Sequence, residues 1–399
     1  MVNILPFYGT RPYSQDAKTL IAPSTDHLSI ENIEIFRKNN YWNYLKILNP
    51  VGQLKEKDSL LEAKTHFDEM KNNHVVKKDS ALNFYIYQIK LGDHKQLGFL
   101  SLVSINDFEK NTIKAHEKIY ERRKIERAEQ MMNIQCQIGP IYVSYKPNPN
   151  IKKLISTQVS KTPAYNFESF DNSVHKLWCV NDEVFIRDLI IMSQKIDYFY
   201  IADGHHRMGA MQYINSLNNN RLLSGNFMIA AFPFDEVKIF DYNRVIKDLN
   251  GLSKETFIKA LSADFKITLK NKPYKPIKKL EFGMYHEKKW YSLQFKGSLE
   301  TNNFLEKLDI NILNKFCITK ILNIKDVNND DRIRFIAGCH GLEALEKKVN
   351  QNPDSVAFSI FPSDITDVIK VSDNNLTMPP KSTWFDPKPL DGLVVYEFD

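Results

Sequence analysis

Short apolar runs alternate with helical segments along this chain in no regular order, and that order limits the possible folds. Residues 227–234 form a continuous apolar run, which predicts a strand buried on both faces. Residues 83–88 and 97–105 predict two strands joined by a turn, and residues 281–297 predict a second hairpin. Because strands and helices do not follow a strict β-α-β repeat, the order predicts an α+β fold with a mixed sheet.

The length of 399 residues predicts two or three domains. We expect an N-terminal α/β domain over 1–150, a core segment over 151–270 and a C-terminal α/β domain over 271–399. No long flexible linker separates them, so we expect the domains to pack closely. Within the last domain, residues 304–350 predict three helical segments, and Asp330-Asp331 has the character of a helix start.

The charge balance argues against a polyanionic partner. The chain has 54 basic and 48 acidic residues, and its longest basic cluster, Arg122-Arg123-Lys124, has glutamates nearby. This pattern predicts a solvated helix face and no nucleic-acid surface. The four cysteines include no C-x-x-C pair, which argues against zinc-ribbon and thioredoxin classes. The sequence shows neither a signal-peptide pattern nor an apolar stretch near the ~20 residues that span a bilayer, so we expect a soluble cytoplasmic protein without a membrane partner.

One segment, Tyr200-Ile-Ala-Asp-Gly-His-His-Arg207, carries most of the chemical information. An apolar strand leads into a helix through Asp203 and Gly204, and the amides of a first helical turn favour an anion. Gly204 permits an unusual φ and a close approach of a ligand. His205, His206 and Arg207 can donate hydrogen bonds or positive charge to a phosphate. Asp203 can hold Mg²⁺ or accept a proton.

Two other interpretations of this segment remain open. It could be a capped helix with two surface histidines, or it could bind zinc. Zinc is disfavoured because adjacent histidines point in different directions on a helix and no partner follows at i+4. The chain has no P-loop, no G-x-G-x-x-G and no protein-kinase signature, so any phosphate bound here is bound in another way.

Residues Tyr200–Arg207 resemble the A-D-G-H-H-R motif of free serine kinases with a ParB/sulfiredoxin-like core. Further stretches resemble a long bacterial family, formerly a domain of unknown function, that shares this motif, and within it the branch of pyrophosphate-dependent serine kinases. These stretches, in chain order, are Pro6-Phe7 with Arg11-Pro12, Ile113–Glu117, Gly139–Ile141, His175–Trp178, Asp241–Ser253 and Met378–Phe385. The resemblance therefore extends over the whole chain and implies a ParB/sulfiredoxin-like core around the motif, with additional α/β subdomains.

The resemblance also implies a reaction. A phosphoryl group would pass from inorganic pyrophosphate to the hydroxyl of free L-serine, giving O-phospho-L-serine and phosphate, with Mg²⁺ as cofactor. By the matching motif, Asp203, His205, His206 and Arg207 would lie at the donor phosphates and the metal, with Asp203 as metal ligand and Asp203 and His205 as catalytic groups. Related enzymes use a glutamate as base, and Glu117 is our candidate from its context alone.

Other residues in or beside these stretches complete the predicted site. A serine hydroxyl needs a carboxylate base, and pyrophosphate needs dispersed positive charge. We expect phosphate contacts from Gly204, Arg11, Arg244, Lys381, Ser382 and Thr383, with Lys388 as a further possible source of charge. We expect substrate contacts from His116, Arg127 and Trp178. Each cation has a plain alternative as a solvated or structurally paired residue, and Met378–Pro387 could be a rigid apolar plug.

Three alternative functions stay open. A serine kinase could use ATP or ADP as donor. A ParB-like protein could bind nucleic acid or nucleotide, although we find neither a helix-turn-helix nor a basic stripe. A sulfiredoxin-like repair enzyme would need a cysteine near Asp203–Arg207, and none is there.

Overall fold

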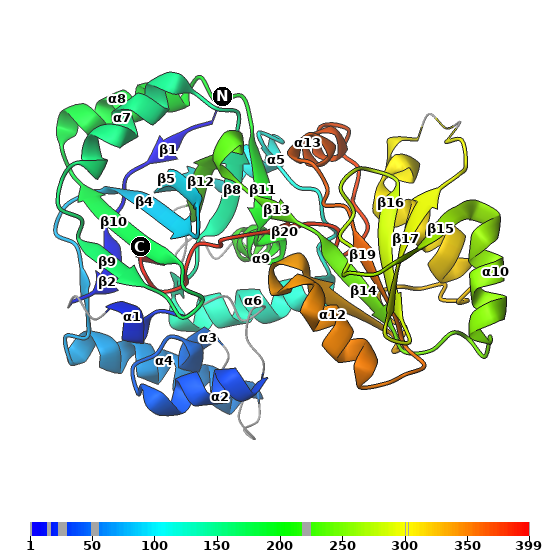
Figure 1. Cartoon of the computed structure of the whole chain (residues 1–399). Coiled ribbons are helices and arrows are strands. Elements are labelled where there is room, and N and C mark those ends of the chain that lie inside the picture. Colours follow the sequence, from blue (N-terminus) through cyan, green and yellow to red (C-terminus); the bar gives the residue numbers. More distant parts are fainter. Residues whose placement is uncertain are drawn as a thin grey trace. The chain divides into compact units, whose positions relative to one another are not determined.

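The computed structural model describes residues 2–13, 17–22, 30–48, 56–217, 225–299, 301 and 303–398. The chain divides into two compact units, which we describe separately (Figure 1). Unit 1 consists of Met1–Ala115, Ile119–Val237 and Pro387–Asp399, and unit 2 of His116–Lys118 and Lys238–Asp386. Each unit therefore combines segments that are distant in the sequence. The three domains expected over 1–150, 151–270 and 271–399 stay a prediction.

A nine-stranded sheet forms the centre of unit 1. Its order is β6 (Ile113–Lys114), β11 (Phe199–Asp203), β8 (Ile141–Tyr145), β12 (Asn226–Pro233), β5 (His94–Ser104), β4 (Phe84–Leu91), β10 (Val174–Val180) and β9 (Tyr165–Glu168), and β1 (Ile4–Leu5) pairs with β5. The pairs β11–β6 and β12–β8 are parallel, and the other pairs are antiparallel. The mixed sheet confirms the predicted α+β class.

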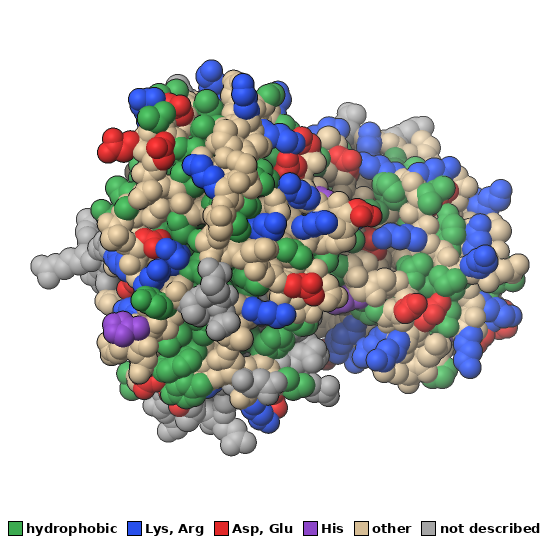
Figure 2. All heavy atoms as spheres, turned by 60° about the vertical axis from the view of Figure 1, so that its left-hand side comes forward, with side chains coloured by type: hydrophobic (Ala, Val, Ile, Leu, Met, Phe, Trp, Pro, Cys, Tyr) green, Lys and Arg blue, Asp and Glu red, His purple; other side chains and the backbone are tan. Residues whose placement is uncertain are grey.

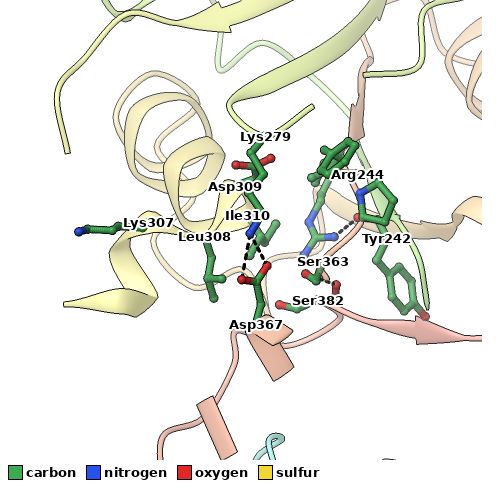
Figure 3. Close-up of a pocket in the computed structure, with 13 residues that line it drawn as sticks. Tyr242, Arg244, Lys279, Lys307, Leu308, Asp309, Ile310, Ser363, Asp367 and Ser382 are labelled. Carbon is green, nitrogen blue, oxygen red and sulfur yellow. Dashed lines mark hydrogen bonds and ion pairs between the residues drawn. The ribbon is translucent and has the colours of Figure 1, made fainter. Parts of the chain in front are cut away.

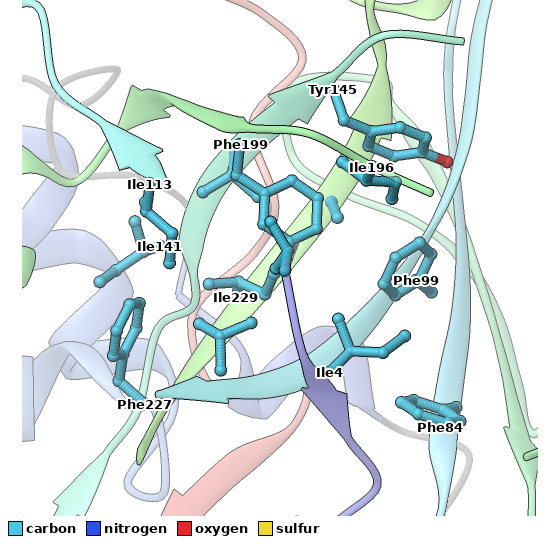
Figure 4. Packing of buried hydrophobic residues seen from close by; sticks show 14 of the residues in the cluster. Ile4, Phe84, Phe99, Ile113, Ile141, Tyr145, Ile196, Phe199, Phe227 and Ile229 are labelled. Carbon is cyan, nitrogen blue, oxygen red and sulfur yellow. The ribbon is translucent and has the colours of Figure 1, made fainter. Parts of the chain in front are cut away.

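Strand β12 confirms the prediction of a fully buried strand. It lies between β8 and β5, and every residue from Phe227 to Phe232 is fully buried. Figure 4 shows the apolar side chains packed here, with Phe227 and Ile229 of β12 among Ile4, Ile141 and Phe199 from other strands. This core stabilises the sheet to which β11 belongs.

Helices and a smaller sheet complete unit 1. The helices are α1 (Ala17–Leu20), α2 (Ile30–Asn39), α3 (Leu45–Leu48), α4 (Glu56–Asn72), α5 (Ile105–Glu109), α6 (Glu121–Ile134), α7 (Pro149–Val159), α8 (Glu183–Ser193) and α9 (His205–Ser216). Asn148 and Asp182 begin α7 and α8 by accepting hydrogen bonds from first-turn amides. The smaller sheet has the order β3 (Val76–Lys78), β2 (Gly9–Pro12), β21 (Val395–Glu397) and β7 (Cys136–Gln137).

Unit 2 contains a six-stranded antiparallel sheet. Its order is β15 (Phe265–Lys270), β17 (Lys289–Phe295), β16 (Glu281–His286), β19 (Val356–Ile360), β14 (Tyr242–Ile246) and β18 (Ile333–Ala337). The pair β16–β17 confirms the hairpin predicted over 281–297. Strands β13 (Ile239–Phe240) and β20 (Trp384–Phe385) form a separate pair. The α-helices are α10 (Lys254–Asp264), α11 (Asp309–Leu313), α12 (Gly341–Asn350) and α13 (Ile365–Asp373).

Strand β18 lies within residues 304–350, for which the sequence predicted three helical segments and no strand. All five of its residues pair with β14, so the sheet supplies the backbone hydrogen bonds that a helix would otherwise supply. Asp330 does not start a helix. Its carboxylate accepts the backbone N–H of Arg332 at 2.9 Å, in the turn that leads into β18.

Candidate functional site

The junction of β11 and α9 has the geometry that its sequence predicts. Asp203 is the last residue of β11, Gly204 is the N-cap with φ 97°, and α9 begins at His205. This φ favours glycine, and a Cβ at Gly204 would lie only 3.1 Å from Arg207 Nε. The first-turn amides of α9 and the positive end of its dipole therefore follow directly on a carboxylate. We call residues 203–207 the 203–207 turn.

Two cations hold the Asp203 carboxylate. Arg207 Nη2 lies 2.9 Å from Oδ2, and Lys388 Nζ lies 2.8 Å from Oδ1. Burial alone would raise the pKa of Asp203, but Lys388 and Arg207 hold it well below its ordinary value. Asp203 is thus ionised at any physiological pH, which suits an electrostatic or metal-binding role better than that of a general base.

Arg207 links Asp203 to a second carboxylate that sequence reasoning missed. Its Nη1 donates to Asp391 Oδ1 at 3.1 Å. A Cβ at Gly139 would lie 1.8 Å from Asp391 Oδ1 and 2.5 Å from Arg207 Nη1. Gly139 therefore leaves the space in which this ion pair forms, so the Gly139–Ile141 motif was the available signal. Burial raises the pKa of Asp391, while Arg207 and Arg127 oppose that rise.

The two histidines of the turn differ in their surroundings. His205 is 3% exposed, and burial lowers its pKa to about 3, with Asp203 opposing the shift. His205 is therefore a neutral imidazole at pH 7, which favours hydrogen-bond donation over positive charge as its contribution to the site. His206 is half-buried, and its ring centroid lies 5.8 Å from that of Tyr120.

A chain of hydrogen bonds supports the segment that carries Lys388 and Asp391. The N–H of Leu390 donates to the hydroxyl oxygen of Tyr87 at 3.3 Å, and that hydroxyl lies 2.7 Å from His175 Nδ1. Nε2 of His175 lies 2.6 Å from Ser173 Oγ, which donates to Asp171. If the Tyr87 hydroxyl donates to Nδ1, the imidazole donates from Nε2 to Ser173. All hydrogen bonds of this series then run in the same donor-to-acceptor direction. Burial lowers the pKa of His175 to about 3, which agrees with this neutral form.

Three other predicted residues of unit 1 have structural partners. Arg11 forms an ion pair with Asp79 at 2.8 Å and bonds the Tyr165 hydroxyl at 3.0 Å. Arg127 Nη1 donates to Gln130 at 2.7 Å, and its charge also acts on Asp391. Trp178 is 4% exposed in the main core, and its indole N–H donates to the carbonyl of Lys161. Their predicted phosphate and substrate roles remain predictions.

The remaining predicted residues belong to unit 2. His116 Nε2 lies 3.2 Å from Thr383 Oγ1, and the His116 carbonyl accepts the N–H of Met378 at 2.8 Å. The structure thus joins two motifs that are far apart in the sequence. Glu117 is half-buried, and Lys381 places its Nζ 5.4 Å from the centroid of the Tyr242 ring. The role of Glu117 as base and that of Lys381 as phosphate ligand remain predictions.

Arg244 and Ser382 line a charged pocket in unit 2 (Figure 3). We call it the Arg244 pocket. Its charged and hydroxyl-bearing lining residues are Tyr242, Arg244, Lys279, Lys307, Asp309, Ser363, Asp367 and Ser382. Lys279 forms an ion pair with Asp367 at 2.8 Å, and Ser363 Oγ donates to the Ser382 carbonyl at 3.3 Å. Sequence reasoning found Arg244 and Ser382 but missed the acidic residues, which come from separate helices.

The described residues contain no group of three or more histidine, cysteine, aspartate or glutamate side chains that could hold a metal ion. Mg²⁺ usually binds through one or two carboxylates and otherwise through substrate phosphates and water. Asp203 fits that mode as a single ionised ligand for an ion that arrives with a phosphate donor. Among the described helices, none is long and apolar enough to cross a membrane.

The chain matches one family of proteins and is similar at low identity to several solved structures. The model of the family DUF1015, described as a protein of unknown function, matches residues 4–311. No curated protein matches the sequence. Among solved structures, a free serine kinase in complex with AMP is 15% identical with a TM-score of 0.36, covering 74% of this chain and 92% of its own. SbnI with a C-terminal truncation from Staphylococcus aureus is 10% identical with a TM-score of 0.39, covering 73% and 85%. A conserved hypothetical protein from Pyrococcus furiosus is 14% identical with a TM-score of 0.35, covering 73% and 94%.

Proposed function

The chain belongs to the DUF1015 family, and we propose that it is a small-molecule kinase that transfers a phosphoryl group from inorganic pyrophosphate to the hydroxyl of free L-serine. The observation that carries this proposal is the 203–207 turn. A helix N-terminus, Arg207 and Lys388 together provide positive charge beside the ionised Asp203. The resemblance of this segment to the A-D-G-H-H-R motif of free serine kinases supplies the reaction.

Each residue of the turn has a chemical task in this proposal. The first-turn amides of α9, Arg207 and Lys388 would bind the donor phosphates, because phosphoryl transfer is catalysed mainly by positioning and dispersed positive charge. Asp203 would hold Mg²⁺ together with pyrophosphate oxygens, and the ion would neutralise charge on the transferring group. His205, as a neutral imidazole, can donate one hydrogen bond to a phosphate oxygen. Glu117 is our candidate base for the serine hydroxyl.

Asp391 is a positioning residue in this scheme. It holds Arg207 by one guanidinium nitrogen while the other nitrogen pairs with Asp203. When a phosphate binds, Arg207 can transfer hydrogen bonds from Asp203 to the ligand and still be oriented by Asp391. Two cations that are already gathered at one carboxylate also lower the reorganisation needed for binding a small dianion.

A direct assay tests the proposal. The protein, Mg²⁺ and L-serine are incubated in parallel with pyrophosphate, ATP or ADP, and O-phosphoserine is measured. We expect pyrophosphate to support product formation far better than either nucleotide. A higher kcat/KM with ATP would overturn the donor assignment, and no product with any donor would overturn the kinase.

A further inference from the structure

The Arg244 pocket contains a buried positive charge that has no acidic partner among the residues that the structure describes. Arg244 is 1% exposed, and within that part of the chain its guanidinium donates only to the carbonyl oxygens of Tyr242 and Pro380. Its Cζ lies 4.9 Å from the centroid of the Phe335 ring, and its Nε has no hydrogen-bond partner among the same residues. A buried guanidinium without a carboxylate is costly in the unliganded protein, so a bound anion there would be favourable.

The opposite charge lies elsewhere in the same pocket. Asp309 and Asp367 both line it, and Lys279 pairs with Asp367. Lys307 also lines the pocket, but its exposed side chain points away from the two carboxylates (Figure 3). Asp309 is 8% exposed, and its Oδ1 accepts the N–H of Leu280 at 3.0 Å. Its Oδ2 accepts no hydrogen bond from any residue in the described part of the chain. Two carboxylates and one ammonium leave this side with a net negative charge. The pocket is therefore dipolar, with an unsatisfied cation and an unsatisfied carboxylate oxygen.

We propose that the Arg244 pocket binds a free α-amino acid as its zwitterion, with the carboxylate on Arg244 and the ammonium on the side of Asp309 and Asp367. A phosphate would also attract Arg244, but the two carboxylates would repel a dianion. The pocket is small, with a free volume of about 20 Å³, which disfavours a nucleotide and limits the ligand to the smallest amino acids.

This inference reassigns Arg244 and Ser382, which the sequence suggested as phosphate ligands. The binding proposal depends only on the pocket of unit 2. It is independent of the proposed function, so the two proposals have separate tests.

Calorimetric titration of the full chain without pyrophosphate and without Mg²⁺ tests binding alone. L-serine is compared with ethanolamine, which lacks the carboxylate, with 3-hydroxypropionate, which lacks the ammonium, and with inorganic phosphate. We expect L-serine to bind, each analogue to bind at least ~10-fold more weakly (1.4 kcal/mol), and phosphate not to compete. Absence of L-serine binding, equal binding of either analogue, or competition by phosphate would overturn the proposal.

Two variants and one control assign the binding to the pocket. Arg244→Gln and Asp309→Asn should each raise the Kd for L-serine at least ~10-fold, because each removes one ionic contact. Asp309→Asn retains the Oδ1 acceptor for Leu280, so we expect this variant to fold. It therefore still tests the pocket if Arg244→Gln does not fold. Arg334→Gln removes an exposed arginine from neighbouring β18 and should leave the Kd unchanged. An unchanged Kd in Asp309→Asn would reject the proposed ammonium site, and with it the zwitterion.

The failures of the two proposals give different results. Normal L-serine binding by a protein that forms no O-phosphoserine would reject the kinase and keep the pocket. O-phosphoserine formation by the wild type, together with an unchanged Kd for L-serine in Arg244→Gln, would reject the pocket and keep the kinase.

Discussion

In the 203–207 turn the buried charges are matched, whereas in the Arg244 pocket they are not. Asp203 has two cations and Arg207 has two carboxylates. Arg244, by contrast, contacts only carbonyl oxygens and an aromatic ring among the described residues. A matched network is stable without a ligand and must exchange partners to bind one. An unmatched charge leaves a position that an oppositely charged ligand can fill without displacing a protein partner. This difference agrees with our two proposals, in which the first region binds a transient, highly charged donor and the second binds a small dipolar ligand.

The largest expected effect comes from removing the charge at the centre of the matched network. Asp203→Asn should lower kcat by ~10²–10³, the usual loss when one group that stabilises transition-state charge is removed. The protein should stay folded, because the amide has the size of the carboxylate and its oxygen still accepts a hydrogen bond from one of the two cations, Arg207 or Lys388. Circular dichroism and steady-state rates check this, and Arg334→Gln serves as the control. Near-normal turnover in folded Asp203→Asn would show that the 203–207 turn does not take part in the reaction.

Alanine variants of the next three residues sharpen the comparison within the turn. We expect losses of kcat/KM to decrease in the order His205, Arg207, His206. Successive helical residues point about 100° apart, so the three side chains cannot all face one ligand. His206 lies beside the ring of Tyr120, which agrees with the smallest effect. A larger loss for His206→Ala than for His205→Ala would reverse this assignment.

The unmatched carboxylate of the pocket should make stability fall as pH rises. Burial raises the pKa of Asp309 from 3.8 to about 6, so the folded protein holds this proton more tightly than the unfolded chain. The stabilisation is full below the unfolded pKa of about 4 and is lost as pH rises through about 6. Between pH 4 and 7 the free energy of unfolding of the wild type should fall relative to Asp309→Asn by roughly 2–3 kcal/mol. Parallel curves for the two proteins would refute the shift.

The turn should show the opposite sign in the same experiment. Burial lowers the pKa of His205 to about 3, so below its ordinary value of 6.5 the unfolded chain binds the proton and the folded protein resists it. The free energy of unfolding of the wild type should therefore fall relative to His205→Gln as pH drops from 7 toward 4, by roughly 3 kcal/mol. An NMR titration that finds His205 protonated at pH 6 in the folded protein would contradict this expectation.

The smallest effect tests the hydrogen-bond chain behind the turn. Tyr87→Phe removes the hydroxyl between Leu390 and His175 and should destabilise the fold by about 1–2 kcal/mol. It should also raise the KM for pyrophosphate more than it lowers kcat, because it loosens the segment that carries Lys388. Tyr145→Phe, a buried tyrosine outside this chain, is the matched control. Equal kinetic effects in both variants would make Tyr87 purely structural.

Local sequence patterns were sufficient for much of the fold and for the first region. The apolar run of β12, the hairpin of β16 and β17 and the turn at Gly204 each follow from a few neighbouring residues. Strand β18 did not, because its backbone conformation depends on pairing with β14, which is distant in the sequence. Chain segments with weak local preference take the structure that their tertiary neighbours impose.

The residues at 203–207 could be identified as a candidate site from the sequence, since the carboxylate, the glycine, the histidines and the arginine are consecutive and a strand-to-helix turn orients them locally. The groups that complete each region depend on tertiary contacts. The tertiary structure brings Lys388 and Asp391 to Asp203 and Arg207, and it brings Asp309 and Asp367 into the pocket of Arg244. Pairing across such separations depends on burial and on the sheet order, and the same burial sets the neutral state of His205 and the raised pKa of Asp309.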